Sequence, residues 1–326
     1  MVIGIGWSGT LVEIKNTLAK TSIKRMLLRC CFVVPVVCFL LPQAMPVQAS
    51  QNPSSPTPSI LNSSVQAPLV MGVFPRRNAK LTFEMFTSLA KHLSDRLGRP
   101  VVLEPSANFK DFWDGVSTLR YDIVHYNQYH YIRSHKKLGY DVIAMNEEFG
   151  RTTISGSIDV RRDSSIKSIQ DLKGQKIVFG GGPKAMMSYI MPTYLLRLAG
   201  LKAGEYQEEF AKSPPNAILS TYFKQSKAAG VGDTVLLLPS VKSKCDTAKL
   251  RHLVVGEPIA HLPWAVSGNI SVKLRTNIQS VLINMAKASN GQKILKKAKL
   301  TGLSIATDED YNRHRQIIFE VLGERY

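Results

Sequence analysis

Residues 69–100 read LVMGVFPRRNAKLTFEMFTSLAKHLSDRLGRP. The first six residues form a short apolar run of the kind that makes a buried strand. Asn78 then offers an N-cap side chain for a helix. The predicted inner face of that helix consists of Leu81, Met85, Leu89, Leu93 and Leu97. Gly98 and Pro100 are typical of a helix end. The stretch therefore predicts one strand–helix unit of an α/β sheet.

The same alternation continues along the chain. Further strands are predicted at residues 101–103, 122–125, 140–145, 154–160, 176–179, 234–238 and 253–255. Helices are predicted at residues 108–119, 129–137, 169–172, 184–199 with a kink at Pro192, 216–229, 272–288 and 311–322. Asn108 and a Thr307–Asp310 capping box mark two helix starts, and Gly139 marks a helix end. Strands and helices in this order, with short connections, indicate parallel sheets and two doubly wound α/β lobes joined by a hinge.

Length and charge narrow the class of protein. The chain has 326 residues, which suits one large or two medium lobes, and a formal net charge of +18. Residues 1–49 hold five basic residues and one acidic residue, so the remainder still carries +14. Such a charge favours anionic partners. Nucleic acid is not expected among them, because basic residues form neither a block of five nor a stripe interleaved with aromatic residues.

The N-terminal region has the pattern of a secretory signal. Basic residues between positions 24 and 29 precede an apolar run at residues 30–41, and Val47 and Ala49 occupy the −3 and −1 places of a cleavage site. We expect cleavage near Ala49 and a location in the periplasm, with Met26 as an alternative start. The other interpretation is a membrane anchor, which Pro35 and a run shorter than about 20 residues both disfavour.

The expected domain organisation follows from these patterns. Residues 51–68 are rich in Ser, Pro and Asn and nearly uncharged, as in a disordered linker. Cys245 remains alone after the signal is removed, so no disulfide within the mature chain is expected. The expected segments are a signal peptide at 1–49, a linker at 50–67, the first part of lobe 1 at 68–153, lobe 2 at 154–255, and at 256–326 a return to lobe 1 with C-terminal helices.

Four turns at strand ends are the candidate ligand-binding segments, because ligands of such sheets bind beyond the C-terminal ends of the strands. They are Phe74–Arg77, His125–Tyr131, Thr152–Ser155 and Gly180–Met187. The second turn is the richest in amide and phenol groups. Alternatives remain for the others: a solvated basic turn for the first, hinge residues for the third, and for Phe109 a place in the core.

Other chemistries find less support. His125, His130 and His135 are five residues apart, which places them on different sides of a helix or strand, so we expect no metal site. The Gly-rich segment 180–182 lacks the spacing of a nucleotide-binding loop. No Gly-x-Ser-x-Gly or His-Glu-x-x-His motif is present. We therefore expect no catalytic residue and no cofactor.

Several strings in order resemble a known family, the periplasmic phosphate/phosphite/phosphonate-binding proteins of ABC importers, which have the type 2 periplasmic-binding fold. The strings are Asp122–Val124 with the aromatic turn to Tyr131, Val160–Gly174 with its Ser-Ile-Gln-Asp-Leu-Lys-Gly end, Pro183 with Tyr189–Pro192, and Gly200-Leu201. The likeness covers residues 69–321. It implies a two-lobed clamp that binds a solute between its lobes and delivers it to a membrane permease.

The resemblance also implies an anion site at a helix N-terminus, where similar proteins carry a Ser-Thr-Ser run. Here Ala185, Met186 and Met187 occupy those places, and Pro214-Pro215 or Pro215-Asn216 replaces a Ser-His pair. The helix N-terminus with Lys184 remains, which suits a carboxylate or another anion. The candidate ligand-binding residues are Phe74, Arg76, Phe109, Tyr126, Asn127, Gln128, Tyr131, Thr153, Ser155, Lys184, Ala185, Met186 and Met187.

The sequence thus predicts a monomeric, non-enzymatic solute-binding component of an ABC importer. Its partners would be a small, anionic ligand and an inner-membrane permease. Two alternatives stay open: a sensory version of the same clamp that reports to a signalling partner, and a periplasmic hydrolase.

Overall fold

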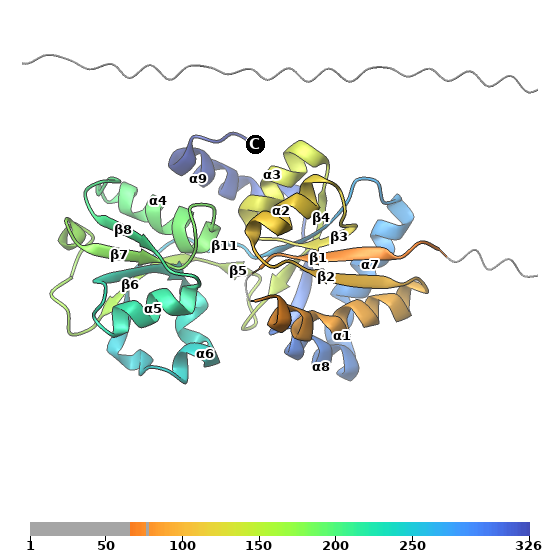
Figure 1. Cartoon of the computed structure of the whole chain (residues 1–326), viewed down its shortest axis with the longest axis horizontal. Coiled ribbons are helices and arrows are strands. Elements are labelled where there is room, and N and C mark those ends of the chain that lie inside the picture. Colours follow the sequence, from red (N-terminus) through yellow and green to blue (C-terminus); the bar gives the residue numbers. More distant parts are fainter. Residues whose placement is uncertain (1–65, 76–77) are drawn as a thin grey trace, which may run out of the picture. The chain divides into compact units, whose positions relative to one another are not determined.

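Two mixed β-sheets organise the residues that the computed structural model describes, which are 66–75 and 78–326 (Figure 1). These residues belong to one compact unit, residues 62–326. The predicted signal peptide, most of the predicted linker and the candidate residue Arg76 lie outside the described residues.

The first lobe contains a six-stranded sheet in the order β13-β4-β12-β3-β1-β2. Its strands are β1 (Leu69–Val73), β2 (Val101–Pro105), β3 (Ile123–His125), β4 (Asp141–Glu147), β12 (Pro263–Val266) and β13 (Gly302–Ile305). Strand β1 pairs in parallel with β2 and β3, whereas β12 and β13 run antiparallel to their neighbours. Segments from both ends of the described chain therefore build one lobe.

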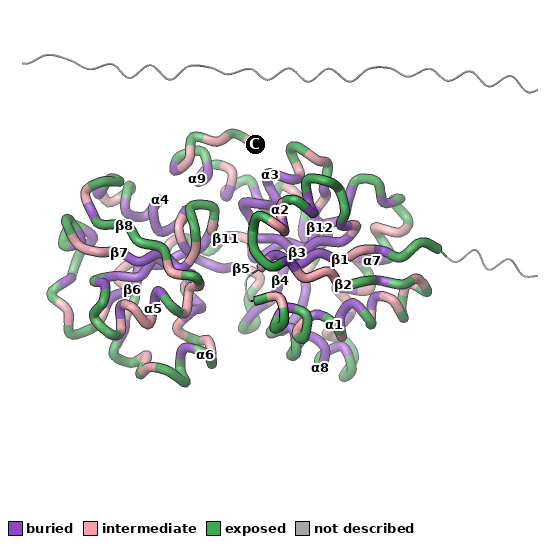
Figure 2. The backbone as a smooth tube through the Cα atoms, viewed as in Figure 1, coloured by how far each residue is buried: buried purple, intermediate pink, exposed green. Residues whose placement is uncertain are grey.

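Helices cover both faces of this sheet. They are α1 (Ala79–Leu97), α2 (Phe109–Ser117), α3 (Gln128–Leu138), α7 (Val272–Ile283), the 3-10 turn η5 (Met285–Lys287) and α8 (Ser289–Lys297). Helices α1, α7 and α8 pack together on one face, and α2 and α3 lie on the other (Figure 1). Figure 2 shows the buried strands between helices whose outer surfaces are exposed.

The second lobe contains a five-stranded sheet in the order β10-β6-β9-β7-β8. Its strands are β6 (Gly156–Arg161), β7 (Lys176–Phe179), β8 (Gln207–Phe210), β9 (Ala228–Gly232) and β10 (Leu250–Val255). Its helical segments are η1 (Gln170–Leu172), η2 (Met186–Ile190), α4 (Met191–Leu198), α5 (Pro214–Tyr222), η3 (Asp233–Leu237), α6 (Pro239–Lys242) and η4 (Thr247–Lys249). Strand β7 pairs in parallel with β8 and β9, and β6 runs antiparallel to β9 and β10.

Two antiparallel strands connect the lobes. They are β5 (Thr153–Ile154) and β11 (Ile259–Ala260), which form a separate two-stranded sheet. After the 3-10 turn η6 (Asp308–Tyr311), helix α9 (Asn312–Leu322) packs against α3 of the first lobe and α4 of the second (Figure 1). The lobes are thus joined by a two-strand link and bridged by α9.

Helix boundaries confirm several sequence predictions. Asn78 and Asn108 cap α1 and α2, each accepting a hydrogen bond from a backbone N–H three residues on. Gly98 and Gly139 end α1 and α3 in the left-handed conformation. The Thr307–Asp310 capping box is also present. These boundaries were predictable because their causes are local.

Other predictions were wrong. The sheets are mixed rather than parallel, since β6, β10, β12 and β13 are antiparallel to their neighbours. Residues 216–229 are not one helix: α5 ends before Lys224, which has a φ of 62°, and buried strand β9 follows. The predicted strand 234–238 is instead the 3-10 turn η3. Strand β9 needs its glycine, because a Cβ at Gly230 would lie 2.4 Å from the ring of Phe179.

Two predicted helices differ in detail. The buried face of α1 is displaced from the predicted one and consists of Thr82, Phe86, Leu89, Ala90 and Leu93, while Leu81 is 39% exposed. The segment 184–199 becomes helical only at Met186 and begins with the π-helical turn η2. Because Pro192 lacks an N–H, it cannot donate to the carbonyl four residues earlier, and the wider turn precedes it.

Candidate functional site

A cavity of about 110 Å³ lies between the lobes. From the first lobe and the connecting segments it is lined by Phe74, Pro75, Phe109, Asn127, Gln128, Ile154 and Leu262. From the second lobe it is lined by Gly180, Gly181, Ala185, Met187, Ser188, Lys212, Ser213, Pro214, Gly232, Thr234 and Val235. Among these residues Lys212 is the charged one, so the cavity wall carries positive charge and no carboxylate.

The beginning of α3 forms the wall in the first lobe. Asn127 caps this helix, since its Oδ1 accepts a hydrogen bond from the N–H of Tyr129 at 3.0 Å. The Asn127 amide group therefore keeps its Nδ2 donors for another acceptor. Gln128 is fully buried, and its Nε2 donates to the carbonyl oxygen of Ala260 at 3.4 Å. Its Oε1 is buried without a hydrogen-bond partner among the described residues, which leaves an acceptor available at the cavity wall.

The beginning of η2 forms the opposite wall. Ala185 holds the N-cap position in extended conformation and provides no side-chain cap. The N–H groups of Met186, Met187 and Ser188 consequently find no acceptor among the described residues. A helix beginning of this kind carries partial positive charge and suits an anion. The buried hydroxyl of Ser188 lines the same place.

Two further segments of the second lobe complete this wall. Ser213 begins α5 without a side-chain cap bond, so its hydroxyl is available, and Lys212 precedes it. Helix α5 supplies no free N–H, because it starts with two prolines. At the beginning of η3, the hydroxyl of Thr234 is buried without a hydrogen-bond partner among the described residues. Gly180 lets the loops approach, since a Cβ there would lie 2.5 Å from the Cα of Pro214.

Aromatic rings form the remaining rim. Phe74 is buried and lies 6.3 Å from the ring of Phe109, which is 41% exposed. Phe109 in turn stacks on His130 at 5.2 Å. Burial, with Lys184 and Arg133 nearby, lowers the pKa of His130 to about 3, so this imidazole is neutral at pH 7. The rim is therefore apolar and uncharged.

The structure brings together six of the predicted site residues in the cavity wall. They are Phe74, Phe109, Asn127, Gln128, Ala185 and Met187. Arg76 lies outside the described residues. The other six do not line this cavity, and each has a different structural position.

The expectation that Tyr126 and Tyr131 face the cleft needs correction. The ring of Tyr126 is fully buried between Phe112 and Tyr140 at 5.7 and 5.8 Å. Tyr131 is also fully buried, and its hydroxyl donates to Asp308 Oδ1 at 2.6 Å. The start of α3 thus places Asn127 and Gln128 at the cavity, whereas Tyr126 and Tyr131 belong to the main hydrophobic cluster.

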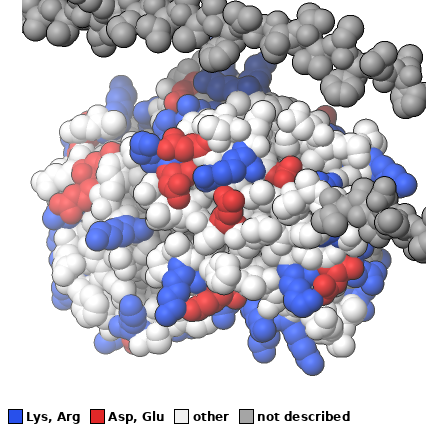
Figure 3. Space-filling model, turned by 45° about the vertical axis from the view of Figure 1, so that its right-hand side comes forward, with Lys and Arg blue, Asp and Glu red and all other residues white. Residues whose placement is uncertain are grey.

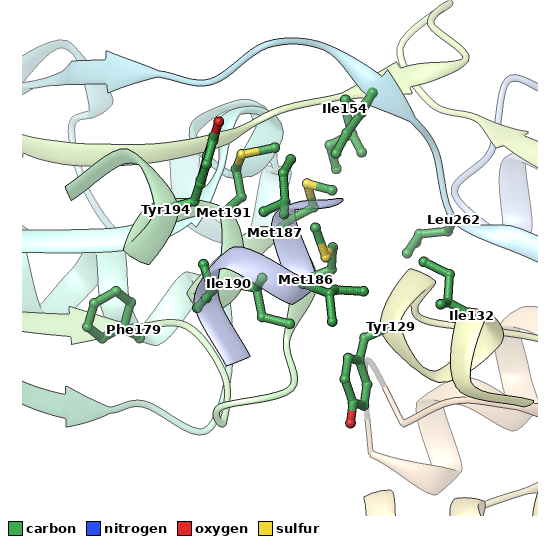
Figure 4. Close-up of a cluster of buried hydrophobic side chains, with 14 of the residues drawn as sticks. Tyr129, Ile132, Ile154, Phe179, Met186, Met187, Ile190, Met191, Tyr194 and Leu262 are labelled. Carbon is green, nitrogen blue, oxygen red and sulfur yellow. The ribbon is translucent and has the colours of Figure 1, made fainter. Parts of the chain in front are cut away.

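The remaining four also lie away from the wall. Met186 is fully buried in the hydrophobic cluster that joins the lobes, next to Tyr129 and Ile132 (Figure 4). Lys184 is exposed, and its Nζ lies 5.5 Å from the Tyr129 ring centre. Thr153 belongs to the connecting strand β5. The Ser155 carbonyl accepts from the backbone N–H of Asp233, and the Ser155 N–H donates to the Asp233 carboxylate, which fixes the end of the link.

Sequence reasoning missed Ser188, Lys212, Ser213 and Thr234. Lys212 and Ser213 follow strand β8, and Thr234 follows strand β9. Both strands were missing from the prediction, so the rule that ligands bind beyond strand ends was not applied there. A Ser-Pro-Pro sequence at residues 213–215 is a helix-start signal that could have placed Ser213.

The three histidines that invited a metal hypothesis are separated. His125 stacks on Trp264 at 4.4 Å, His130 packs against Phe109, and His135 donates from Nδ1 to the Tyr140 carbonyl at 2.8 Å. Within residues 66–75 and 78–326, no three His, Cys, Asp or Glu side chains are grouped to hold a metal ion. On the face drawn in Figure 3, basic and acidic side chains are interspersed over uncharged surface. A search of the same residues for a helix long and apolar enough to cross a membrane found none.

Comparisons with known proteins decide the family. A family model described as "ABC transporter, phosphonate, periplasmic substrate-binding protein" matches residues 71–311. The chain belongs to this family. It is accordingly a substrate-binding protein of an ABC transporter, and the family is periplasmic and works with a membrane permease.

Solved structures agree on the fold of this substrate-binding protein. A binding protein component of an ABC phosphonate transporter from Pseudomonas aeruginosa is 14% identical with a TM-score of 0.67, over 78% of this chain and 86% of that one. PhnD1 from Prochlorococcus marinus, solved in complex with methylphosphonate, is 18% identical with a TM-score of 0.67, over 78% and 97%. The periplasmic aliphatic sulphonate binding protein SsuA from Escherichia coli is 15% identical with a TM-score of 0.56, over 78% and 86%. At these identities the likeness establishes the two-lobed type 2 fold.

Proposed function

We propose that the substrate-binding protein captures its anion in the 110 Å³ cavity and contacts it from both lobes. The observation that carries this proposal is a pair of buried polar atoms. Gln128 Oε1 in the first lobe and Thr234 Oγ1 in the second are both without a hydrogen-bond partner among the described residues, and both residues line this cavity. Leaving such groups unpaired costs about 1–3 kcal/mol each, so a ligand that pairs them gains affinity.

The two walls suggest how the ligand is oriented. The anionic group fits the second lobe, where N–H groups of η2, the Ser213 hydroxyl and Lys212 converge. A hydrogen-bond donor on the same ligand fits Gln128 Oε1 in the first lobe. Phe74 and Met187 provide apolar walls between them. The proposed ligand is therefore a small anion that also carries a hydroxyl or amino group.

Contacts to both lobes couple binding to closure. A ligand held by Gln128 and by η2 stabilises the closed arrangement over any open one by the contacts that only the closed form makes. The link β5–β11 is the proposed hinge, with lobe 1 at 68–153 and 256–326 and lobe 2 at 154–255. This role as a monomeric carrier exported after cleavage near Ala49 needs no bond-breaking chemistry.

A thermal-shift experiment on residues 50–326 tests the proposal. The series comprises methylphosphonate, phosphate, phosphite, small carboxylates and metal chelates. A true ligand at 100 times its dissociation constant adds about 2.7 kcal/mol to the free energy of unfolding. No shift with any of them would contradict the proposed ligand class.

Matched threonine variants show whether the cavity is the site. Thr234→Val and Thr193→Val both remove a buried hydroxyl that has no hydrogen-bond partner among the described residues, but only Thr234 lines the cavity. We expect T234V to lower the ligand-induced shift and T193V to leave it unchanged. Equal effects of the two variants would place the ligand elsewhere.

A further inference from the structure

A second cavity of about 520 Å³ also lies between the lobes. It is bounded by α1 and the segment after α8 in the first lobe, and by Leu238 and the first residues of α6 in the second. In Figure 1, α6 at the bottom of the second lobe lies across from α1 and α8 of the first lobe. Phe74 lines both cavities, so the two lie next to each other at this residue.

The two cavities differ in what their walls leave unsatisfied. The first has two buried polar atoms without a partner, Gln128 Oε1 and Thr234 Oγ1. None of the described residues lining the second has such an atom. Asn146, for example, accepts from Trp264 Nε1 at 2.8 Å and donates to Glu148 at 3.2 Å. Glu148, Lys296 and Lys299 also line the second cavity, but none of its described lining residues has a fully buried side-chain atom that lacks a partner, so we expect its occupant to bind there mainly by apolar contact.

Apolar side chains provide that contact. Leu81 and Met85 of α1 face the cavity from the first lobe, and Leu238 faces it from the second. An apolar cavity of about 150 Å³ is enough for benzene, so 520 Å³ accommodates a substituent of several carbons, whereas the first cavity is too small for more than a compact group.

Phe149 adds an independent observation. It occupies a tight turn in which Glu148 and Arg151 exchange backbone hydrogen bonds at 3.1 and 3.0 Å. Its φ is +54°, a conformation that favours Gly, Asn or Asp in such turns and is strained for Phe. The ring is 45% exposed and lines the second cavity. Backbone strain of this kind clusters at ligand clamps and other functional sites, so it supports a role for Phe149 at this cavity.

We infer that the second cavity holds the apolar substituent of an anion whose charged group lies in the first cavity. The inference rests on the proposed function, and it names the substrate class: an organic anion, such as a phosphonate, with an alkyl or aryl group of several carbons. The substituent would pass Phe74 and contact Leu81 and Phe149.

Calorimetric titration with n-alkylphosphonates from methyl to hexyl tests this inference. Full burial of each added methylene strengthens binding about fourfold, so the five additional methylenes should make hexylphosphonate bind about a thousandfold tighter than methylphosphonate, and at least about fiftyfold tighter if they are only partly buried. Equal affinities along the series would overturn the inference and leave the proposed function intact. Hexan-1-ol, which has the alkyl chain but no anionic group, provides the converse control. If it bound as tightly as hexylphosphonate, the proposed anion site would be overturned, while the apolar cavity would keep its role.

Two exposed residues of α1 provide matched variants. Leu81→Glu and Phe83→Glu both replace an exposed apolar side chain, at 39% and 47% exposure, but only Leu81 lines the cavity. We expect L81E to remove the gain from chain length while methylphosphonate affinity changes less than twofold, and F83E to change neither. Identical titrations for the two variants would overturn the assignment.

Phe149→Asn removes the aromatic ring and introduces a residue that tolerates the left-handed backbone conformation of this turn. We expect its melting temperature to rise and its hexylphosphonate affinity to fall about fivefold, with methylphosphonate unchanged. Wild-type affinity for hexylphosphonate in F149N would overturn the role of Phe149.

Discussion

Helices α3 and η2 begin on opposite walls of the same cavity, and they differ in what their first backbone N–H groups bind. In the first lobe, Asn127 caps α3 with its own side chain. In the second lobe, Ala185 leaves the first N–H groups of η2 without an acceptor among the described residues. The cap of α3 satisfies the N–H of Tyr129, whereas none of the first three N–H groups of η2 has an acceptor among the described residues. This difference, together with Lys212 at the same wall, is the reason we propose that the anionic end of the ligand binds the second lobe.

The largest expected effect comes from capping η2. Ala185→Asp places a carboxylate where the N-cap side chain accepts from the N–H groups two and three residues on. It would occupy the proposed anion site and repel the ligand. We expect the affinity of the best anion of the thermal-shift series to fall at least a hundredfold, about 2.7 kcal/mol, measured by calorimetry.

Ala288→Asp is the matched control, because Ala288 is the uncapped N-cap residue of α8 and lines neither cavity. A288D should stabilise the fold by about 1 kcal/mol and leave affinity unchanged. Equal affinities for A185D and the wild type would show that the open end of η2 does not hold the anion.

A smaller effect is expected at the capped end. Gln128→Leu removes the unpaired Oε1 acceptor but keeps the apolar volume. The Ala260 carbonyl keeps its interaction with His314 Nε2 at 3.1 Å. Affinity should fall about tenfold, about 1.4 kcal/mol, while stability changes little. Gln279→Leu removes an amide that donates to the Ile143 carbonyl at 2.7 Å outside both cavities, and it should leave affinity unchanged.

The wall formed by α3 also has a buried histidine, His130, which makes the stability of the protein depend on pH. The pKa of His130 on α3 is about 3 in the folded protein, below the unfolded value of 6.5. The unfolded state therefore binds the proton first, so stability is complete above pH 6.5 and is lost as pH falls toward 3. His130 contributes a loss of about 1.4 kcal/mol at pH 5.5.

Urea unfolding of the ligand-free protein at pH 7.5 and 5.5 measures this loss. His130→Phe should lose correspondingly less stability over the same interval. Identical losses in the variant and the wild type would mean that His130 is protonated in the folded state.

Local signals account for what was predictable from the sequence. The caps at Asn78 and Asn108 and the stops at Gly98 and Gly139 depend on neighbouring residues, and the structure has all four. Strands β8 and β12 have no such signal: β8 is exposed throughout and β12 is fully buried, so neither alternates. Their places are set by sheet partners distant in the sequence.

The residues of the candidate site were predictable where local signals mark them and were missed where distant sheet pairing places them. Asn127, Gln128 and Ala185 follow directly from strand–helix junctions that the sequence marks. Lys212, Ser213 and Thr234 depend on β8 and β9, which become recognisable only from their pairing with β7. Tyr131 was misplaced because the same helix turns it toward Asp308 rather than toward the cavity. Which face of a short helix meets a ligand depends on packing across the whole lobe.

A crystal structure of residues 50–326 with the best anion of the thermal-shift series tests the central claim most directly. The anionic oxygens should lie within about 3.2 Å of the backbone nitrogens of Met187 or Ser188, with a hydrogen-bond donor of the ligand near Gln128 Oε1. Density for the anion on another surface, or an empty cavity at saturating ligand, would contradict the account.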